Sequence, residues 1–422
     1  MMHTTILLLI LIYFSLLQLN IGDITISKVN KSKFSISEKK FLLYDVNYGE
    51  GFNLRRDVYL RIANTVRHLR ENGYNYVLVL PPFGRLHHWK KNEEKIPWKS
   101  LFDINSLKKF VPVIDFDDFL KEEGGHIKID LILYLQHYKE GWGSNFEIKY
   151  DERDCIDNTY YNKVNNQWYG WFFGYQNNVT GRKFLCLSIQ GQSSTLSNAI
   201  IESYSNNRII FIDRTETILH DHFSDIFYWK ARRSMRYAKH LVEYGDTFRK
   251  ENFNSTDIDD KTLMDDDWRL VKKDHGNAIG GNYVCVHWRR GDFVRSHRKN
   301  IPSIKGAALQ IKNFAKKYNI DKVFVSSDCN NIEWEKLVNE INGSLEIFRY
   351  QNKNLSDGGV SIIDQYICSH ARAFIGSYVS TFSFRIHEDR EIMGFLPETT
   401  FNRLCEDDNF NCEQPTKWMI QY

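Results

Sequence analysis

The sequence predicts an α/β fold of two domains that face each other across a cleft, each built on a mostly parallel sheet covered by helices. Three observations predict it: a length of 422 residues, two regions in which short apolar strands alternate with helical segments, and a polar acidic stretch between them. Single hydrophobic cores stop growing at roughly 250–300 residues, so a chain of this length should divide. We place the domains at residues 23–250 and 251–422.

The first region contains a strand, a glycine-containing turn, a helix and a second strand. In order, these segments are residues 41–46, 47–51, 54–69 and 76–80. Apolar residues recur at helical spacing in the third segment, and Asn72-Gly73 is typical of a helix end. Pro81-Pro82 ends the second strand. This order is typical of a parallel sheet.

The second region repeats the alternation more regularly. Its expected strands are residues 283–287, 322–326, 345–348 and 373–376, and its expected helices are 304–318, 332–341, 361–371 and 381–392. Residues 252–267 are polar and acidic, which favours a linker or surface excursion. In such folds ligands bind beyond the carboxyl ends of the strands, so we expect the site there.

The N-terminus indicates the secretory pathway. Residues 6–17 are almost wholly apolar, which is too short for a membrane span but fits the central part of a signal peptide. We therefore assign residues 1–22 to a signal peptide, although the start lacks Lys and Arg and a short uncleaved anchor stays open. We expect no membrane span in the mature chain. Five Asn-x-Ser/Thr sequons agree with this route and predict surface positions: Asn30, Asn178, Asn254, Asn342 and Asn354.

Composition excludes one class of function and limits the cysteine chemistry. With 56 basic and 53 acidic side chains, the chain lacks the strong positive charge of an electrostatic nucleic-acid binder. Of seven cysteines, an odd number that leaves at least one thiol free, we expect Cys405 to pair with Cys412 and Cys155 with Cys186. We expect the other three to be small buried apolar residues. These are Cys285, Cys329 and Cys368.

The first candidate site is the turn from Gly49 to Asn53, between a strand and a helix. Its two glycines let a ligand approach the backbone, and the amides at the helix start suit a phosphate. Glu50 between the glycines could act as a general base for a hydroxyl group. An ordinary strand–helix turn with a solvated glutamate gives the same pattern, so the turn alone is weak evidence.

The second candidate is the sequence from His287 to Phe293 at the end of a strand. Arginine binds phosphate oxygens through two parallel hydrogen bonds, and Arg289 could neutralise charge on a departing diphosphate. Adjacent arginines at a strand end point to opposite sides, so Arg290 should form a structural ion pair, with Asp292 as a candidate partner. A surface cluster of ion pairs is an equally good interpretation of the spacing.

The third candidate combines a helix start at Ser380, Thr381 and Phe382 with Asp364 on the preceding helix. Hydroxyl groups and free amides at a helix start suit phosphate, although an ordinary N-cap is the commoner meaning. A carboxylate such as Asp364 is a natural acceptor for guanine N–H groups.

We expect no metal ion. The pairs His87-His88 and His220-Asp-His222 lack the spacing of a zinc site. The two Asp-x-Asp-like segments, residues 115–118 and 257–260, do not follow a clear strand end.

Taken together, the motifs resemble the GDP-fucose protein O-fucosyltransferase family. They are Gly49–Asp57, His287–Phe293, Gly359–Gln365 and Ser380–Glu388, and the resemblance runs from about residue 41 to the C-terminus. It departs from the family at Trp288, where leucine is expected, and at Gly291, where lysine is expected.

The resemblance implies two Rossmann-like domains of the GT-B type, with GDP-fucose in the cleft. It implies Glu50 as catalytic base and Arg289 as pyrophosphate contact in an inverting transfer to Ser or Thr hydroxyls. In the branch most like this chain, the acceptors are folded, disulfide-bonded thrombospondin type 1 repeats in the endoplasmic reticulum. The nucleotide site would be lined by Gly49, Gly51, Phe52, Asn53, His287, Trp288, Arg289, Asp364, Ser380, Thr381 and Phe382.

Two alternatives stay open at the level of sequence. One is a fucosyltransferase that acts on glycans or on epidermal-growth-factor-like repeats. The other is a secretory lectin or folding helper that keeps the fold without turnover.

Overall fold

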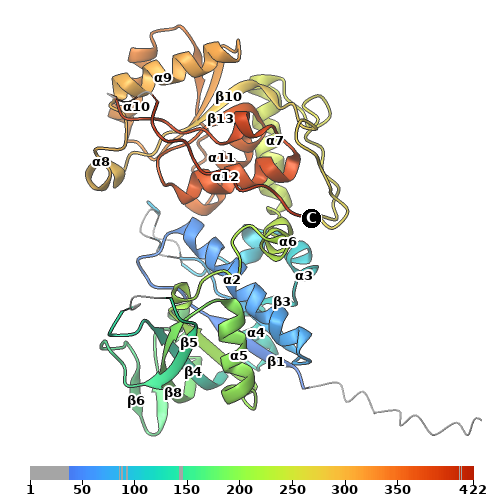
Figure 1. Ribbon diagram of the computed structural model, residues 1–422, viewed down its shortest axis with the longest axis vertical. Coiled ribbons are helices and arrows are strands. Elements are labelled where there is room, and N and C mark those ends of the chain that lie inside the picture. Colours follow the sequence, from blue (N-terminus) through green and yellow to red (C-terminus); the bar gives the residue numbers. More distant parts are fainter. Residues whose placement is uncertain are drawn as a thin grey trace, which may run out of the picture. The chain divides into compact units, whose positions relative to one another are not determined.

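The computed structural model describes residues 38–84, 86, 89–91, 94–141, 146–407, 409 and 411–422. Residues 39–422 form one compact unit. The described residues form two β-sheets, one of nine strands and one of four, with helices on their faces (Figure 1). The predicted α/β fold is confirmed. The predicted signal peptide and Asn30 lie outside the described residues.

The first sheet has a parallel centre. Its strand order is β3-β2-β1-β9-β4-β8-β7-β6, and β5 pairs with β8. The strands from β3 to β8 in this order are parallel, and β5, β6 and β7 add antiparallel pairings. The bounds are β1 (Lys40–Tyr44), β2 (Tyr76–Leu80), β3 (Val113–Asp115), β4 (Ile127–Gln136), β5 (Lys149–Arg153), β6 (Asn162–Val164), β7 (Gln167–Tyr169), β8 (Val179–Gln190) and β9 (Ile209–Asp213).

Successive side chains of a strand point to opposite faces of the sheet, and here both faces are apolar. Helices therefore cover both of them. Leu42 and Leu78 belong to the core beneath α2, whereas Phe41 and Val77 pack with Phe116 of α4 on the opposite face. The helices of this region are α2 (Phe52–Glu71), α3 (Ile104–Lys108), α4 (Phe116–Glu122), α5 (Ser193–Ala199) and α6 (Ile226–Ser234).

The second sheet is wholly parallel in the order β12-β11-β10-β13. Its strands are β10 (Gly281–His287), β11 (Lys322–Ser326), β12 (Glu346–Phe348) and β13 (Ala371–Ile375). Its helices are α8 (Phe293–Ser296), α9 (Ile304–Lys317), α10 (Asn331–Ile341), α11 (Asp357–Ser369), α12 (Thr381–Met393) and α13 (Pro397–Thr400). In Figure 1, α9 and α10 lie to one side of this sheet, and α7 (Lys239–Phe253), α11 and α12 lie to the other.

Side chains of β10 alternate between these two faces. Val284 and Val286 belong to the core beneath α9 and α10, whereas Tyr283 and Cys285 belong to the core beneath α11. The latter core is continuous with the one beneath α2, so the two sheets share one hydrophobic cluster.

The stretch after α7 is anchored rather than loose. The α7 residue Arg249, with no exposed surface, pairs with Asp257 (2.7 Å) and Asp260 (3.0 Å). Phe253 stacks on Tyr283 of β10 with ring centroids 4.0 Å apart. The acidic residues expected in a surface linker therefore neutralise a buried arginine. The stack of Phe253 on Tyr283 holds the end of α7 against the second sheet. The predicted domain boundary at residue 250 falls within this helix.

Three disulfides join described cysteines. Two are the predicted pairs, Cys155–Cys186 and Cys405–Cys412. The third joins Cys285 to Cys368, so the prediction that both are free buried thiols is wrong. Their side chains meet because β10 and α11 pack face to face, a contact between distant segments that sequence spacing does not reveal. Cys329 is a free buried cysteine, as predicted.

Within the described residues, no helix is long and apolar enough to cross a membrane.

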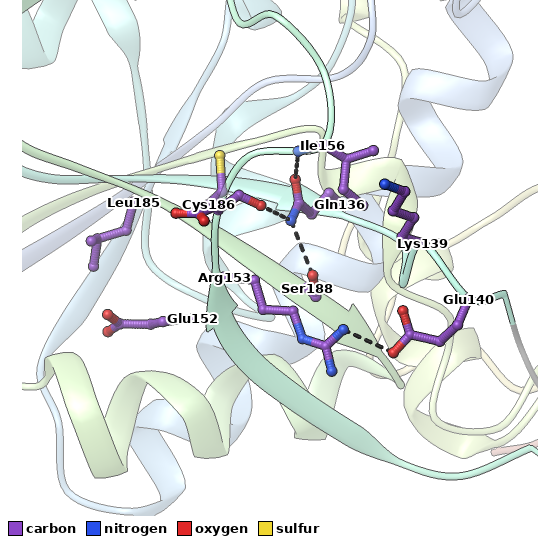
Figure 2. A pocket seen from close by; sticks show the side chains of 10 residues that line it. Gln136, Lys139, Glu140, Glu152, Arg153, Ile156, Leu185, Cys186 and Ser188 are labelled. Carbon is purple, nitrogen blue, oxygen red and sulfur yellow. Dashed lines mark hydrogen bonds and ion pairs between the residues drawn. The ribbon is translucent and has the colours of Figure 1, made fainter.

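One hollow of the first sheet is lined by none of the predicted catalytic or nucleotide-binding residues. It is lined from β4, β5 and β8, and there Gln136 Nε2 donates to Ser188 Oγ (3.0 Å), as Figure 2 shows. The same Nε2 donates to the Asp154 carbonyl (3.1 Å). Arg153 pairs with Glu140 at its rim (2.8 Å). Its polar groups therefore bind one another, beside the Cys155–Cys186 bond.

Candidate functional site

The turn after β1 places Glu50 at the start of α2. The Glu50 amide donates to the Asn47 carbonyl (2.9 Å), and Arg55 Nε donates to the Glu50 carbonyl (3.1 Å). Arg55 also donates to the Val46 and Asn47 carbonyls and pairs with Asp45 (3.3 Å). The arginine thereby fixes the turn from inside, and the glutamate side chain is not needed to hold it.

The Glu50 side chain is half-buried and has no hydrogen-bond or ion-pair partner in the described part of the chain. Burial raises the pKa of its carboxyl group, and the nearby negative charge of Glu216 raises that pKa further. An unpartnered carboxylate with a raised pKa is a better proton acceptor than a solvated one.

The glycines of this turn have ordinary backbone angles, because neither is among the described residues with positive φ. A Cβ atom at Gly49 would meet nothing within 4 Å. The fold itself therefore does not require glycine at this position. The helix that follows begins at Phe52, and its N-cap, Gly51, supplies no side-chain cap. The first amides of α2 are thus left without a capping side chain, an arrangement that suits an anion.

Gln365 joins the elements that carry the first and third candidate sites. Its Nε2 donates to Asn53 Oδ1 (2.9 Å) and to the Phe382 carbonyl (3.4 Å), and its Oε1 accepts from Arg56 Nη1 (2.6 Å). Gln365 and Arg56 have no exposed surface. Gln365 follows Asp364 in α11, and its side-chain amide links this helix to the start of α2 and the start of α12. The sequence motif contained Gln365, but we assigned it no role.

His287 ends β10 and faces the start of α12. Its Nδ1 lies 2.8 Å from Ser383 Oγ, and its ring stacks on Phe382 with centroids 4.3 Å apart. Ser383 Oγ also accepts from the Ser377 amide (3.1 Å), and Ser377 Oγ bridges the His287 carbonyl and the Arg289 amide. Burial, together with the charge of Arg289, lowers the pKa of His287 well below its usual value, so the ring is neutral.

Arg289 and Arg290 have different ion-pair partners. Arg290 pairs with Glu333 of α10 (2.8 Å), so the suggested partner Asp292 is wrong for it. Asp292 (2.5 Å) and Asp328 (2.7 Å) instead hold the guanidinium of Arg289. These carboxylates orient Arg289 at the strand end.

Trp288 does not line a ligand site with its side chain, which corrects the expectation from sequence. The side chain is 1% exposed and belongs to the core beneath α9 and α10. Its backbone N–H donates to Ser326 and its carbonyl accepts from Ser327. The alternation along β10 that turns His287 towards α12 turns the next residue into this core.

Asp364 carries a buried oxygen without a partner. Its Oδ2 accepts from Ser326 Oγ (2.8 Å), whereas its Oδ1 has no hydrogen bond in the described structure. Burial raises the pKa of this carboxyl group to about 7. A buried acceptor left open is costly unless a ligand or water fills the place.

The start of α12 is also uncapped. Ser380 is its N-cap residue, yet the hydroxyl group forms no capping hydrogen bond. The helix starts at the expected N-cap, and only the side-chain capping bond is missing. Ser380 is buried, and Thr381 and Phe382 are half-buried. Hydroxyl and amide groups remain here beside the His287 ring.

Two of the residues weighed as metal ligands have structural partners. His220 pairs with Asp57 (3.2 Å), and Asp115 accepts from the Trp98 amide (2.9 Å). His87 and His88 lie outside the described residues. Among the residues that are described, no group of three or more His, Cys, Asp or Glu side chains could hold a metal ion.

Four sequons lie in the described part of the chain. Asn254, Asn342 and Asn354 are exposed. Asn178 is half-buried, and its Nδ2 donates to the Gly125 carbonyl (3.0 Å).

Comparison with known proteins gives consistent matches. The family described as "GDP-fucose protein O-fucosyltransferase" matches residues 41–393. The chain is 50% identical over 407 residues to "GDP-fucose protein O-fucosyltransferase 2" of Caenorhabditis elegans, covering 95% of both chains. It is 46% identical over 396 residues to the Homo sapiens protein of that name, covering 92% of this chain and 91% of the other.

A crystal structure of POFUT1 in complex with GDP-fucose has the same fold. It superposes with a TM-score of 0.58 at 15% identity, covering 86% of this chain and 97% of that one. This likeness supports the predicted GT-B-type fold. With the family match over most of its length, the chain belongs to the GDP-fucose protein O-fucosyltransferase family.

Proposed function

We propose that the chain is an inverting peptide O-fucosyltransferase. It moves L-fucose from GDP-β-L-fucose to a Ser or Thr hydroxyl of folded, disulfide-bonded thrombospondin type 1 repeats in the lumen of the endoplasmic reticulum. The observation that carries the proposal is the 50% identity to a protein with this donor in its name, over 95% of both chains. The site supports it, because the Gln365 amide joins the elements that hold Asn53, Phe382 and Asp364.

Glu50 is the base in this proposal. The acceptor oxygen attacks C1 of fucose as its proton passes to the Glu50 carboxylate. The bond between C1 and the β-phosphate oxygen breaks, and GDP leaves with the electron pair. Attack from the face opposite the leaving group inverts the configuration at C1. A carboxylate without a partner among the described residues and with a raised pKa suits this step.

Arg289 and the start of α12 stabilise the leaving diphosphate. A guanidinium held by two carboxylates is oriented before the ligand arrives, which limits the reorganisation needed during reaction. The neutral His287 ring and the uncapped hydroxyl and amide groups of Ser380 and Thr381 supply further donors. The stacked Phe382 ring keeps the His287 ring in place.

Asp364 recognises guanine in this proposal, and this makes GDP binding depend on pH. Guanine N1–H and the exocyclic amine donate to the carboxylate in its ionised form. In the free protein the pKa of this carboxyl group is about 7. We expect GDP affinity to rise between pH ~6 and pH ~8, with release of a proton on binding. Asp364→Asn should weaken GDP binding by roughly 10- to 100-fold and remove this pH dependence. Calorimetry in two buffers of different ionisation enthalpy measures both effects.

The same carboxyl group should lower stability above acidic pH. Its pKa is raised in the folded state, so the folded protein binds more protons than the unfolded chain between about pH 4 and pH 7. Stability contributed by this group is therefore lost as pH rises through that window. Asp364→Asn should unfold at a higher temperature than the unaltered protein at pH ~8 and not at pH ~4. Equal unfolding temperatures at the higher pH would contradict the buried-carboxylate account.

The acceptor and the independence from metal are tested together. Purified protein is incubated with labelled GDP-fucose and with separately folded thrombospondin and epidermal-growth-factor-like repeats, each with a reduced control. We expect label only on the folded thrombospondin repeat, and we expect it to persist in excess chelator. Label on the growth-factor-like repeat or on free glycans would replace the acceptor. Loss restored by added metal would overturn the metal-free reaction. GDP binding without any transfer would indicate a non-catalytic lectin or folding helper.

A further inference from the structure

The segment that follows β9 forms hydrogen bonds with the chain that leads into the Glu50 turn. Its short helix η4 (Thr215–Thr217) begins with Thr215, whose amide and hydroxyl group both donate to the Asp45 carbonyl, at 3.0 and 2.6 Å. Glu216 Oε2 then accepts from the Asn47 amide (3.1 Å). Thr215 and Glu216 thus bind backbone groups on either side of Val46, just before the turn that carries Glu50.

Glu216 is itself held by a residue in an unusual backbone conformation. Arg214 lies in the left-handed region, with φ 62°. Its Nε pairs with Glu216 Oε1 (3.2 Å), and its Nη1 donates to Tyr134 Oη (2.8 Å). Residues other than glycine adopt this backbone region at a cost in free energy. They keep it where the surroundings fix them, often beside functional sites. Both carboxylate oxygens of Glu216 are therefore engaged by groups that fix its position.

Glu216 also lies close enough to Glu50 for their charges to interact. A neighbouring negative charge disfavours the ionised form of a carboxyl group and so raises its pKa. The carboxylate is then a stronger base. Burial acts in the same direction, and three cations act against both. The charges that act most strongly on the Glu50 carboxyl group are those of Glu216, Arg55, Arg214 and Arg61.

We propose that Glu216 is a positioning residue for the Glu50 base: it ties the Asn47–Gly51 turn to η4 through the Asn47 amide and keeps a second negative charge beside the base. The role rests on the proposed function of Glu50. It differs from a purely structural role because it affects the strength of the base as well as its place.

Glu216→Gln tests the charge. An amide oxygen can still accept from the Asn47 amide, but the negative charge is gone, so Glu50 should lose its proton at lower pH. At saturating GDP-fucose, where guanine holds Asp364 ionised, the acid limb of the kcat/KM profile for the acceptor reports the base in the enzyme–donor complex. We expect this limb to move to lower pH by roughly half a pH unit or more. GDP affinity should stay within about twofold of the unaltered protein, because the described hydrogen bonds and ion pairs of Glu216 involve only the first sheet and its loops.

Glu216→Ala tests the anchor. It removes both the charge and the acceptor for Asn47, so kcat should fall roughly tenfold or more because the base is misplaced. The shift of the acid limb should persist.

Glu123→Gln is the matched control. Glu123 pairs with Arg208 (2.5 Å). Arg208 lies just before β9, whereas Glu216 lies after the other end of that strand. The control should leave both the limb and kcat unchanged.

The outcomes separate the two proposals. An unmoved acid limb in Glu216→Gln, or a limb that moves equally in Glu123→Gln, overturns the role of Glu216. If the alanine variant does not fold, the glutamine variant alone decides. A wild-type protein that transfers no fucose would instead overturn the proposed function.

Discussion

Replacing Glu50 by glutamine should reduce fucose transfer by roughly 10²- to 10⁴-fold while GDP binding stays within about twofold. The reason is that glutamine keeps the shape of the side chain but cannot accept the hydroxyl proton. The turn itself should survive, since Arg55 holds it through the backbone carbonyls of Glu50, Val46 and Asn47. Single-turnover transfer and GDP titration on the same preparation measure the two quantities.

Glu71→Gln provides the control for this variant. Glu71 is the last residue of the same helix and pairs with Arg67 on its exposed side. It should transfer fucose at the normal rate. Normal turnover in Glu50→Gln would remove Glu50 from the mechanism, and a parallel loss of GDP binding would show that the turn had collapsed.

Replacing Arg289 by alanine should lower both donor affinity and rate. The proposed function places the guanidinium on the diphosphate of the bound donor, where it stabilises the charge that grows as GDP leaves. We expect kcat to fall roughly 10²- to 10³-fold, with weaker GDP binding in addition. Arg289→Lys should recover only part of this loss, because an ammonium group lacks the planar fork that binds two oxygens at once.

Arg295→Ala is the matched control for the arginine. Arg295 is an exposed residue of α8, further along the chain from the same strand end. Its loss should leave transfer unchanged. An unaltered rate in Arg289→Ala would exclude Arg289 from the reaction. A fall equal to that of Arg295→Ala would show only a general effect of positive charge.

Local pattern was enough to predict the four strands of the second sheet, β1 and β2 of the first, and the loops that carry the candidate site. The segment 41–46 is nearly β1, and 283–287 falls within β10, because both are short apolar runs ended by turn residues. The structural ion pair expected of Arg290 is present, with Glu333 as its partner.

Features that depend on distant contacts could not be predicted in this way. The antiparallel strands β5, β6 and β7 are short and largely exposed, so they lack an apolar signal. The Cys285–Cys368 bond depends on how α11 packs on β10.

Buried polar contacts between distant helices were missed for the same reason. Gln365 and Ser383 looked like ordinary helix residues, and only their partners in other elements show what they hold together. Glu216 lay outside every motif. Its link to the Asn47 amide spans 169 positions of the sequence.

A crystal structure of the Glu50→Gln protein with GDP-fucose and a folded thrombospondin repeat tests the central claim most directly. We expect the Arg289 guanidinium on the β-phosphate and guanine on Asp364. We also expect the substituted side chain at position 50 to lie within hydrogen-bond distance of the acceptor hydroxyl, on the face of the sugar opposite the phosphate. A donor bound away from Arg289, or a side chain at position 50 that cannot reach the acceptor oxygen, would contradict the account.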